Sequence, residues 1–186
     1  GCAEGMLLDA VKGIAGETIG VELNREMLGS LRKRGHYAYE TLEECLEQEA
    51  GSVDAAVSFD VIEHVMDPQK VLRQLYELLD EGGRIIMGTP TDSPVLRELA
   101  GKNFEEFLFH MGHLWIFSED SLRMCFERAG FKEIEIKNIY KYSLGNVFGW
   151  LQKKRPVGNK KYDFVTDTLN EVWKHEMERQ GKGDYL

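Results

Sequence analysis

Three groups of residues in this sequence have types and spacings that could do chemistry. The first is Gly1–Gly5 (GCAEG), which leads directly into a helical pattern of apolar residues. Glycines at such a turn let a ligand approach the backbone, and a helix N-terminus offers unpaired N–H groups to it. The second is Glu22, at the end of a short apolar stretch, where a carboxylate can accept hydrogen bonds from both hydroxyls of a ribose. An ordinary loop and a solvated strand-end glutamate are the alternative interpretations.

The third group combines carboxylates with histidines. Asp60, Glu63 and His64 are spaced i, i+3 and i+4, so on a helical turn they would share one face. His110 and His113 follow in an aromatic segment. A histidine here could take a proton from an acceptor hydroxyl, or the set could bind a divalent metal that lowers the hydroxyl pKa. A structural turn that caps the next helix is the third interpretation, and the partial ligand set favours it over metal.

Alternating strands and helices must position these groups. Hydrophobic periodicity and capping signals predict helices over 6–15, 25–34, 41–49, 67–83, 118–129 and 163–180, and strands over 18–22, 36–39, 53–58, 84–87 and 132–139. Residues 92–109 form an irregular or helical insert. This alternation predicts a mostly parallel sheet covered on both faces, with the ligand at the carboxyl ends of the strands.

Four stretches resemble the class I S-adenosylmethionine-dependent methyltransferases in order and spacing: GCAEG, VELNREM, DAAVSFDVIEHVMDP and LLDEGGRIIMGTP. The stretch HLWIFSEDSLRMCFERAGF is similar to the family segment before an antiparallel end hairpin. The resemblance spans about residues 1–140 and is strongest to small-molecule enzymes of the quinone-biosynthesis group. It implies a Rossmann-like α/β sandwich with a mostly parallel sheet, an antiparallel end hairpin and helices on both faces. The family's first strand, with its terminal acid, is absent from this chain.

The resemblance also implies residue roles. Gly1, Cys2, Ala3 and Gly5 would line the methionine end of S-adenosylmethionine, Glu22 would hold the ribose, and Leu23, Tyr39 and Glu40 would contact the adenine. Ser58, Phe59 and Asp60 would face the sulfonium. His64, His113 and Asp60 are the catalytic candidates, and the alternative metal set is Glu63, His64 and His110. Because the sulfonium is already an activated methyl donor, the protein must mainly align the acceptor and exclude water.

Composition limits the partners and the location. With 32 acidic and 23 basic residues the formal charge is −9, which disfavours nucleic acid. No apolar run approaches the roughly 20 residues of a membrane span. Three scattered cysteines fit a reducing, cytoplasmic setting. We expect one methyltransferase domain over 1–186, with a cofactor-binding half (1–90), a lid or substrate insert (91–118) and a C-terminal half ending in a helix (119–186).

The leading functional hypothesis is methyl transfer from S-adenosylmethionine to a small-molecule acceptor, with O-methylation favoured and S-adenosylhomocysteine as the product. One alternative is a metal-dependent O-methyltransferase acting on a catechol, a quinone precursor or an RNA 3′ end. The other is an inactive methyltransferase-like binding domain. The aromatic insert walls an apolar pocket or forms the core of a lid. Tyr142, Phe148 and Trp150 either close that pocket or mediate contacts in a homodimer.

Overall fold

The N-terminal half of the chain alternates short strands with helices. The computed structural model describes residues 1–110, 112–158 and 162–186, except for the side chain of His110. The elements in this half are α1 (Met6–Val11), β1 (Ile19–Val21), α2 (Arg25–Lys33), β2 (Tyr37–Tyr39), α3 (Leu42–Glu49), β3 (Val53–Phe59), the 3-10 turn η1 (Ile62–His64), α4 (Pro68–Leu78) and β4 (Leu79–Gly88).

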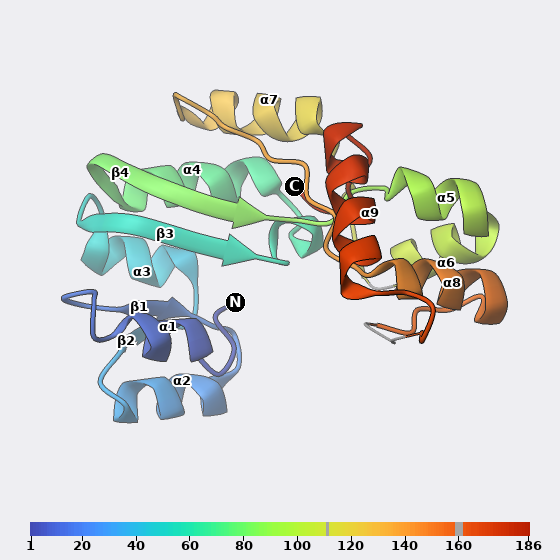
Figure 1. Cartoon of the computed structure of the whole chain (residues 1–186). Coiled ribbons are helices and arrows are strands. Elements are labelled where there is room, and N and C mark those ends of the chain that lie inside the picture. The colour runs from blue at the N-terminus through green and yellow to red at the C-terminus, as the bar shows by residue number, and fades with distance from the viewer. Residues whose placement is uncertain (111, 159–161) are drawn as a thin grey trace.

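The strands form two parallel pairs with helices on both sides, which confirms the expected α/β class. β1 pairs with β2, and β3 pairs with β4. Among the described strands these pairs are two separate two-stranded sheets, whereas the sequence pattern predicted one continuous sheet. In Figure 1 the β3–β4 pair lies against α3 and α4, while α1 and α2 accompany β1 and β2.

The C-terminal half adds five helices to the described chain: α5 (Pro94–Ala100), α6 (Lys102–His110), α7 (Glu119–Ala129), α8 (Leu144–Lys153) and α9 (Asp167–Arg179). Figure 1 shows α5, α6, α8 and α9 gathered beyond the carboxyl ends of β3 and β4, and we call this group of helices the lid. The expected lid over 91–118 contains only α5 and α6 of this group. The helix α7 instead packs on α4. Ligands of α/β sheets bind at the carboxyl ends of strands, so the lid faces the expected site.

Side-chain caps fix where the main helices begin. Asn24 accepts hydrogen bonds from the backbone N–H groups of Glu26 and Met27 at the start of α2. Asp67 caps α4, whose first residue is the proline that the sequence predicted there. Ser118 caps α7 through a reciprocal pair of hydrogen bonds with Ser121. These local signals explain why the helix starts agree with the sequence pattern better than the ends do.

The described residues form three hydrophobic core clusters, of which the smallest, with Leu28, Leu31 and Ala38, joins α2 to β2. Of the two larger clusters, the first fills the space between β3–β4, α4 and α7 and contains Ile62, Leu72, Phe117, Leu122, Phe126, Ala129 and Leu186. The second lies within the lid and contains Leu96, Phe104, Leu108, Tyr140, Leu144, Val147, Trp150 and Met177. The Trp150 ring meets Phe104 edge-to-face at 5.3 Å and Phe107 at 5.2 Å, and it is only 2% exposed. Trp150 is therefore a lid core residue and is not available for a dimer contact.

Several predicted boundaries are wrong. The helix that begins at Pro68 ends at Leu78, because Leu79 already pairs with Val53 as the first residue of β4. Residues 132–139 form no strand in the described structure, and antiparallel pairing there is limited to isolated bridges of Tyr185 with Ile139 and Pro90. The predicted helix over 6–15 ends at Val11. The helix α8 was not predicted at all.

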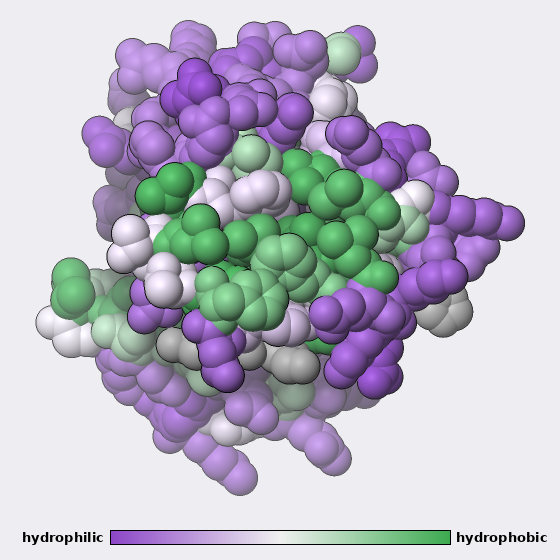
Figure 2. Space-filling view, turned by 45° about the vertical axis from the view of Figure 1, so that its right-hand side comes forward, coloured by the Kyte–Doolittle hydropathy of each residue, from purple (hydrophilic) through white to green (hydrophobic). Residues whose placement is uncertain are grey.

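One face of the molecule combines polar residues with an apolar patch (Figure 2). Figure 2 shows hydrophobic residues gathered in a central patch with polar residues around it. None of the helices in the described ranges has the length and apolar character that a membrane crossing requires.

Candidate functional site

The glycine-containing loop is closed over the end of β1 by the carboxylate of Glu22. Its Oε2 accepts the backbone N–H of Ala3 at 2.8 Å, and its Oε1 accepts that of Asn24 at 3.0 Å. The N–H of Cys2 donates to the carbonyl of Val21 at 2.9 Å, which ties the loop to the strand. These bonds bring the first residues of the chain and the end of β1 together, as the sequence predicted.

Gly5 has a conformation and a position that only glycine suits. Its φ is +76°, in the left-handed region, and a Cβ built on it would overlap the side chain of Leu31 on α2. Leu23, beside Glu22, is 75% exposed. Its apolar side chain therefore offers an open surface next to the loop against which a planar group could lie.

Glu22 is ionised at neutral pH and keeps acceptor capacity. Burial raises the pKa of its carboxyl, but the N–H groups of Asn24 and Ala3 lower it more, so the net pKa lies below its ordinary value. Each carboxylate oxygen has about two acceptor positions, and the bond from the backbone of Ala3 or Asn24 uses one of them. A ligand with two neighbouring hydroxyls could therefore still bind here.

Tyr39 and Glu40 have partners on neighbouring helices. The Tyr39 hydroxyl donates to Oε1 of Glu49 at 2.6 Å, and this bond, with burial, raises the pKa of Tyr39 to about 12. Glu40 forms an ion pair with Arg25 at 3.1 Å. Both side chains therefore stabilise the end of β2. Their expected contacts with the adenine stay predictions.

The end of β3 places Asp60 in a strained conformation. Phe59 is 49% exposed, Ser58 is half-buried, and Asp60 has a φ of +54° that non-glycine residues rarely adopt. The N–H of Asp60 donates to the carbonyl of Gly88 at 3.0 Å, which fixes this turn against β4. Lys141 Nζ lies 3.4 Å from Asp60 Oδ2. Nothing in the sequence pattern pointed to Lys141.

A carboxylate and two histidines gather beside this turn. Ligand-capable atoms of Glu63, His64 and His113 all lie within 4.8 Å of one another. The two imidazole ring centroids are 4.9 Å apart. The predicted metal set contained His110, whose side chain lies outside the described residues; among the described residues His113 joins Glu63 and His64. The predicted helical face is not formed, because η1 covers only Ile62–His64 and Asp60 precedes it.

Two atoms of this group are buried without a hydrogen-bond partner in the part of the chain that the structure describes. Oε2 of Glu63 accepts the Thr89 hydroxyl at 3.1 Å, but its Oε1, which lies 3.9 Å from His64 Nε2, and His113 Nδ1 make no hydrogen bond there. The Glu63 residue is only 1% exposed. Unpaired buried polar atoms are costly, so they mark a place where a further ligand would be stabilising.

The histidines suit proton transfer or metal binding. Nδ1 of His64 lies 3.1 Å from the carbonyl of Gly112, which can only accept, so Nδ1 is assigned as the donor in this hydrogen bond. Burial, and then the proximity of His64, lower the pKa of His113. A neutral imidazole is the form that both a general base and a metal ligand require.

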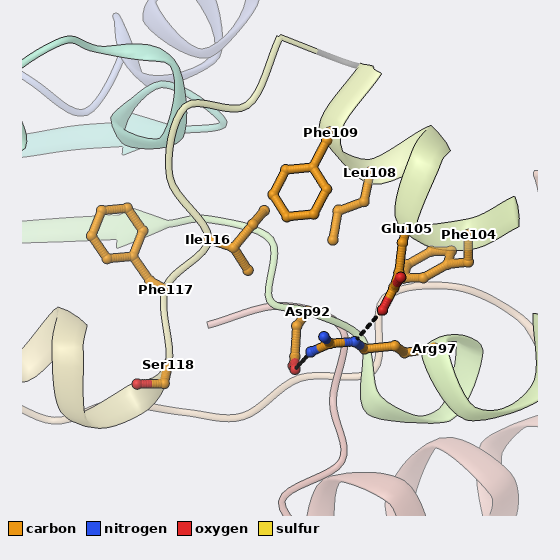
Figure 3. Close-up of a pocket in the computed structure, with 9 residues that line it drawn as sticks. All are labelled: Asp92, Arg97, Phe104, Glu105, Leu108, Phe109, Ile116, Phe117 and Ser118. Atoms are coloured by element: carbon orange, nitrogen blue, oxygen red, sulfur yellow. Dashed lines mark hydrogen bonds and ion pairs between the residues drawn. The ribbon is translucent and has the colours of Figure 1, made fainter. Parts of the chain in front are cut away.

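A cavity of about 280 Å³ lies between the lid and the segment that follows His113. Figure 3 shows Leu108, Phe109 and Ile116 on its apolar side. On the polar side Arg97 spans two carboxylates, with Nε 2.8 Å from Glu105 and Nη1 3.0 Å from Asp92 (Figure 3). The cavity can hold a ring-sized apolar group with a polar substituent. Sequence reasoning predicted an aromatic wall in the insert but missed this ion-pair network.

Comparisons with known proteins show which family the chain resembles. The methyltransferase domain family model matches residues 1–136. The ubiquinone biosynthesis O-methyltransferase of Xanthomonas oryzae is 26% identical over 107 residues, which are 54% of this chain and 45% of that protein. Its counterpart in Aeromonas salmonicida is 29% identical over 101 residues, or 50% of this chain and 42% of that protein. The chain thus spans a little under half the length of these curated relatives.

Solved structures agree on the fold. An S-adenosylmethionine-dependent methyltransferase from Thermotoga maritima is 29% identical with a TM-score of 0.57, over 75% of this chain and 65% of that one. Another from Archaeoglobus fulgidus is 17% identical with a TM-score of 0.60, over 100% of this chain and 80% of that one. The family match extends from the glycine loop through α7 and includes the strand-end residues between them. The chain therefore belongs to the methyltransferase domain family.

Proposed function

We propose that this chain is an S-adenosylmethionine-dependent methyltransferase that acts on a small-molecule acceptor, with a hydroxyl oxygen as the acceptor atom. The observation that carries the proposal is the Glu22 carboxylate, held by the N–H groups of Ala3 and Asn24 at the end of β1 beside the glycine loop. An ionised carboxylate in this position is suited to paired ribose hydroxyls. The family match over residues 1–136 supports it.

In the proposed enzyme, each group of residues has a role that follows from its position in the fold. The cofactor supplies a methyl group on a sulfonium, already activated for transfer. In this proposal Glu22 binds the ribose, Leu23 lies against the adenine, and the loop of Gly1, Cys2, Ala3 and Gly5 receives the methionine end. Ser58, Phe59 and Asp60 border the reacting centre, and His113, whose pKa burial lowers, takes the proton of the acceptor hydroxyl.

The acceptor site in this proposal is the cavity beneath the lid, within a single domain over 1–186. Its apolar wall suits an aromatic ring, and the Asp92–Arg97–Glu105 network suits a polar ring substituent. The curated relatives that match are named for O-methylation in ubiquinone biosynthesis, which supports a phenolic acceptor.

Isothermal titration of the protein with S-adenosylhomocysteine tests the cofactor half of the proposal. We expect one site per chain with micromolar affinity, and the absence of binding would refute the proposal. Methyl transfer to catechol and to a matched aromatic amine then tests the acceptor atom. Transfer to the amine but not to catechol would assign N-methylation.

The Glu63–His64–His113 group favours a second candidate, a metal-dependent O-methyltransferase. The two buried unpaired atoms, Glu63 Oε1 and His113 Nδ1, fit a divalent cation, and the donor set of one carboxylate and two imidazoles suits zinc or manganese. A cation there would supply Lewis acidity to an acceptor hydroxyl. Glu63, His64 and His113 would hold it, and Thr89 would orient the carboxylate of Glu63.

Calorimetric titration with Zn²⁺ and with Mn²⁺ separates the two candidates without an activity assay. The metal-dependent candidate predicts saturable binding that His113→Ala removes, whereas His175→Ala on α9 leaves it unchanged. Equal metal binding by the protein and by His113→Ala would eliminate that candidate. Methyl transfer that is unaffected by a chelator would do the same.

A further inference from the structure

The last residues of the chain form an extended segment that reaches the end of β3. The backbone of Leu186 exchanges hydrogen bonds with Thr89 at 3.0 and 3.1 Å, and the backbone of Tyr185 exchanges them with Ile139 at 2.8 and 3.1 Å. The segment thereby lies between the extension of β4 and the chain around residue 139. Tyr185 bonds Ile139 on one side of the segment, and the neighbouring Leu186 bonds Thr89 on the other, so the direction of the Tyr185 side chain is well determined.

The Tyr185 ring is packed into the turn that carries Asp60. It is 8% exposed, and a Cβ on Gly88 would lie 2.5 Å from its Cε1 and 2.8 Å from its Oη. The ring can occupy this position only because residue 88 is a glycine and has no side chain. Because the N–H of Asp60 bonds the carbonyl of Gly88 at 3.0 Å, the Tyr185 hydroxyl and Asp60 belong to one compact turn.

Lys141 connects Tyr185 and Asp60 from the solvent side. Its Nζ lies 4.2 Å from the centroid of the Tyr185 ring and 3.4 Å from Oδ2 of Asp60. The first contact is a cation–π interaction and the second an ion pair. Burial and then the negative charge of Asp60 raise the pKa of the Tyr185 hydroxyl, and hydrogen bonding to the Asp60 carboxylate raises this pKa further. The hydroxyl consequently stays protonated and can donate to the carboxylate.

We propose that Tyr185 is a positioning residue that directs the Asp60 carboxylate toward the point of methyl transfer, with Lys141 as the second support. The inference rests on the proposed function, since it takes the turn after β3 as the place where the reacting group of the cofactor lies. Asp60 has a strained backbone and an exposed side chain, so the turn alone leaves its carboxylate free to rotate. Tyr185 and Lys141 restrict it to one direction, which is what preorganised electrostatics require.

Sinefungin provides a probe that needs no acceptor. This analogue carries a protonated amine on carbon where S-adenosylmethionine carries the methyl sulfonium, while S-adenosylhomocysteine has neither group. The ratio of the dissociation constants of S-adenosylhomocysteine and sinefungin therefore reports a carboxylate directed at the transfer point. Calorimetry would measure this ratio for the protein and for Tyr185→Phe, Asp60→Asn and the double variant, each with its thermal midpoint.

We expect the protein to prefer sinefungin, and Tyr185→Phe to reduce that preference about tenfold through the lost hydrogen bond to a charged group. Affinity for S-adenosylhomocysteine should stay within about twofold, because phenylalanine keeps the ring on Gly88 and under Lys141. Asp60→Asn should have the same effect, and adding Tyr185→Phe to it should change nothing further. Tyr76→Phe, an exposed tyrosine on α4, is the matched control.

An unchanged ratio in Tyr185→Phe, or additive effects in the double variant, would overturn the positioning role. No preference for sinefungin in the unmodified protein would also overturn it, because Asp60 would then not face the transfer point. Failure of both ligands to bind the unmodified protein would refute the proposed function itself. Binding of S-adenosylhomocysteine with an unaltered ratio would refute only the inference.

Discussion

Replacing Glu22 by glutamine tests the cofactor site at the side chain on which it depends. The carboxylate accepts from Ala3 N at 2.8 Å and from Asn24 N at 3.0 Å. Glutamine keeps one acceptor oxygen and replaces the other with an NH₂ group, which faces a backbone donor. One of the two charge-assisted bonds is therefore lost. Loss of the bond from Ala3 would open the glycine loop, and loss of the bond from Asn24 would weaken the turn after β1.

The structure sets the expected size of this effect. A hydrogen bond to a charged group contributes about 1.5–3 kcal/mol, and the low end applies because Glu22 is only half-buried and water can replace the lost partner. At about 1.4 kcal/mol per factor of ten, S-adenosylhomocysteine should bind about tenfold more weakly. Losing a ribose bond as well would bring the effect toward a hundredfold.

Isothermal titration with S-adenosylhomocysteine measures this effect, and Glu17→Gln is the matched control. Glu17 is exposed just before β1, and its side chain makes no hydrogen bond or ion pair with the residues that the structure describes. We expect the control to bind within about twofold of the unmodified protein. If Glu22→Gln did the same while its thermal midpoint was unchanged, the reasoning that places the ribose on Glu22 would be refuted.

Three further predictions concern the scaffold. Gly88→Ala should lower the free energy of unfolding by about 1–3 kcal/mol in urea titrations, because its Cβ would meet Phe59 at 2.7 Å and Tyr185 at 2.5 Å. The control Gly29→Ala, which has open space on α2, should not destabilise the protein. The bond from His36 to Asp9 at 2.9 Å, aided by Arg34, lowers the pKa of Asp9 below 3.8. Its stabilisation is therefore present above that pH and is lost as the pH falls through the lowered pKa, so urea midpoints should fall less on acidification in Asp9→Asn than in the unmodified protein. Trp150→Ala should cost about 3–5 kcal/mol in the same assay, whereas Leu151→Ala, 49% exposed, should have little effect.

Sequence reasoning succeeded where short-range rules decide the structure. The Asp67-Pro68 start of α4 and the Ser118 start of α7 are local capping signals, and the structure has both caps. The glycine loop and Glu22 were predicted together because a turn and the next strand end lie close along the chain. Their direct hydrogen bond joins residues separated by only 19 positions.

The pattern failed where pairing or long-range contact decides. Ile134 and Ile136 alternate toward the core beside Ile62 and Leu72, as the predicted strand over 132–139 required. Alternation reports which side chains are buried, however, and not whether the backbone finds a partner. Lys141 and Tyr185 reach Asp60 from the far end of the chain, and no periodicity encodes such a contact. The position of His113 beside Glu63 and His64 likewise depends on how the chain returns from α6.

The segment that follows α6 connects the lid to the proposed reacting groups through hydrogen bonds. The N–H groups of Leu114 and Trp115 both donate to the carbonyl of Glu63, at 2.8 and 3.1 Å, and Trp115 Nε1 donates to the carbonyl of Val65 at 2.8 Å. These bonds fix His113 beside η1, while Ile116, the next residue, already lines the cavity under the lid. An acceptor that displaces this cavity wall would therefore move the backbone that holds His113. In the proposed enzyme acceptor shape and proton transfer are coupled through a few residues, so a substitution at Ile116 should change kcat as well as KM.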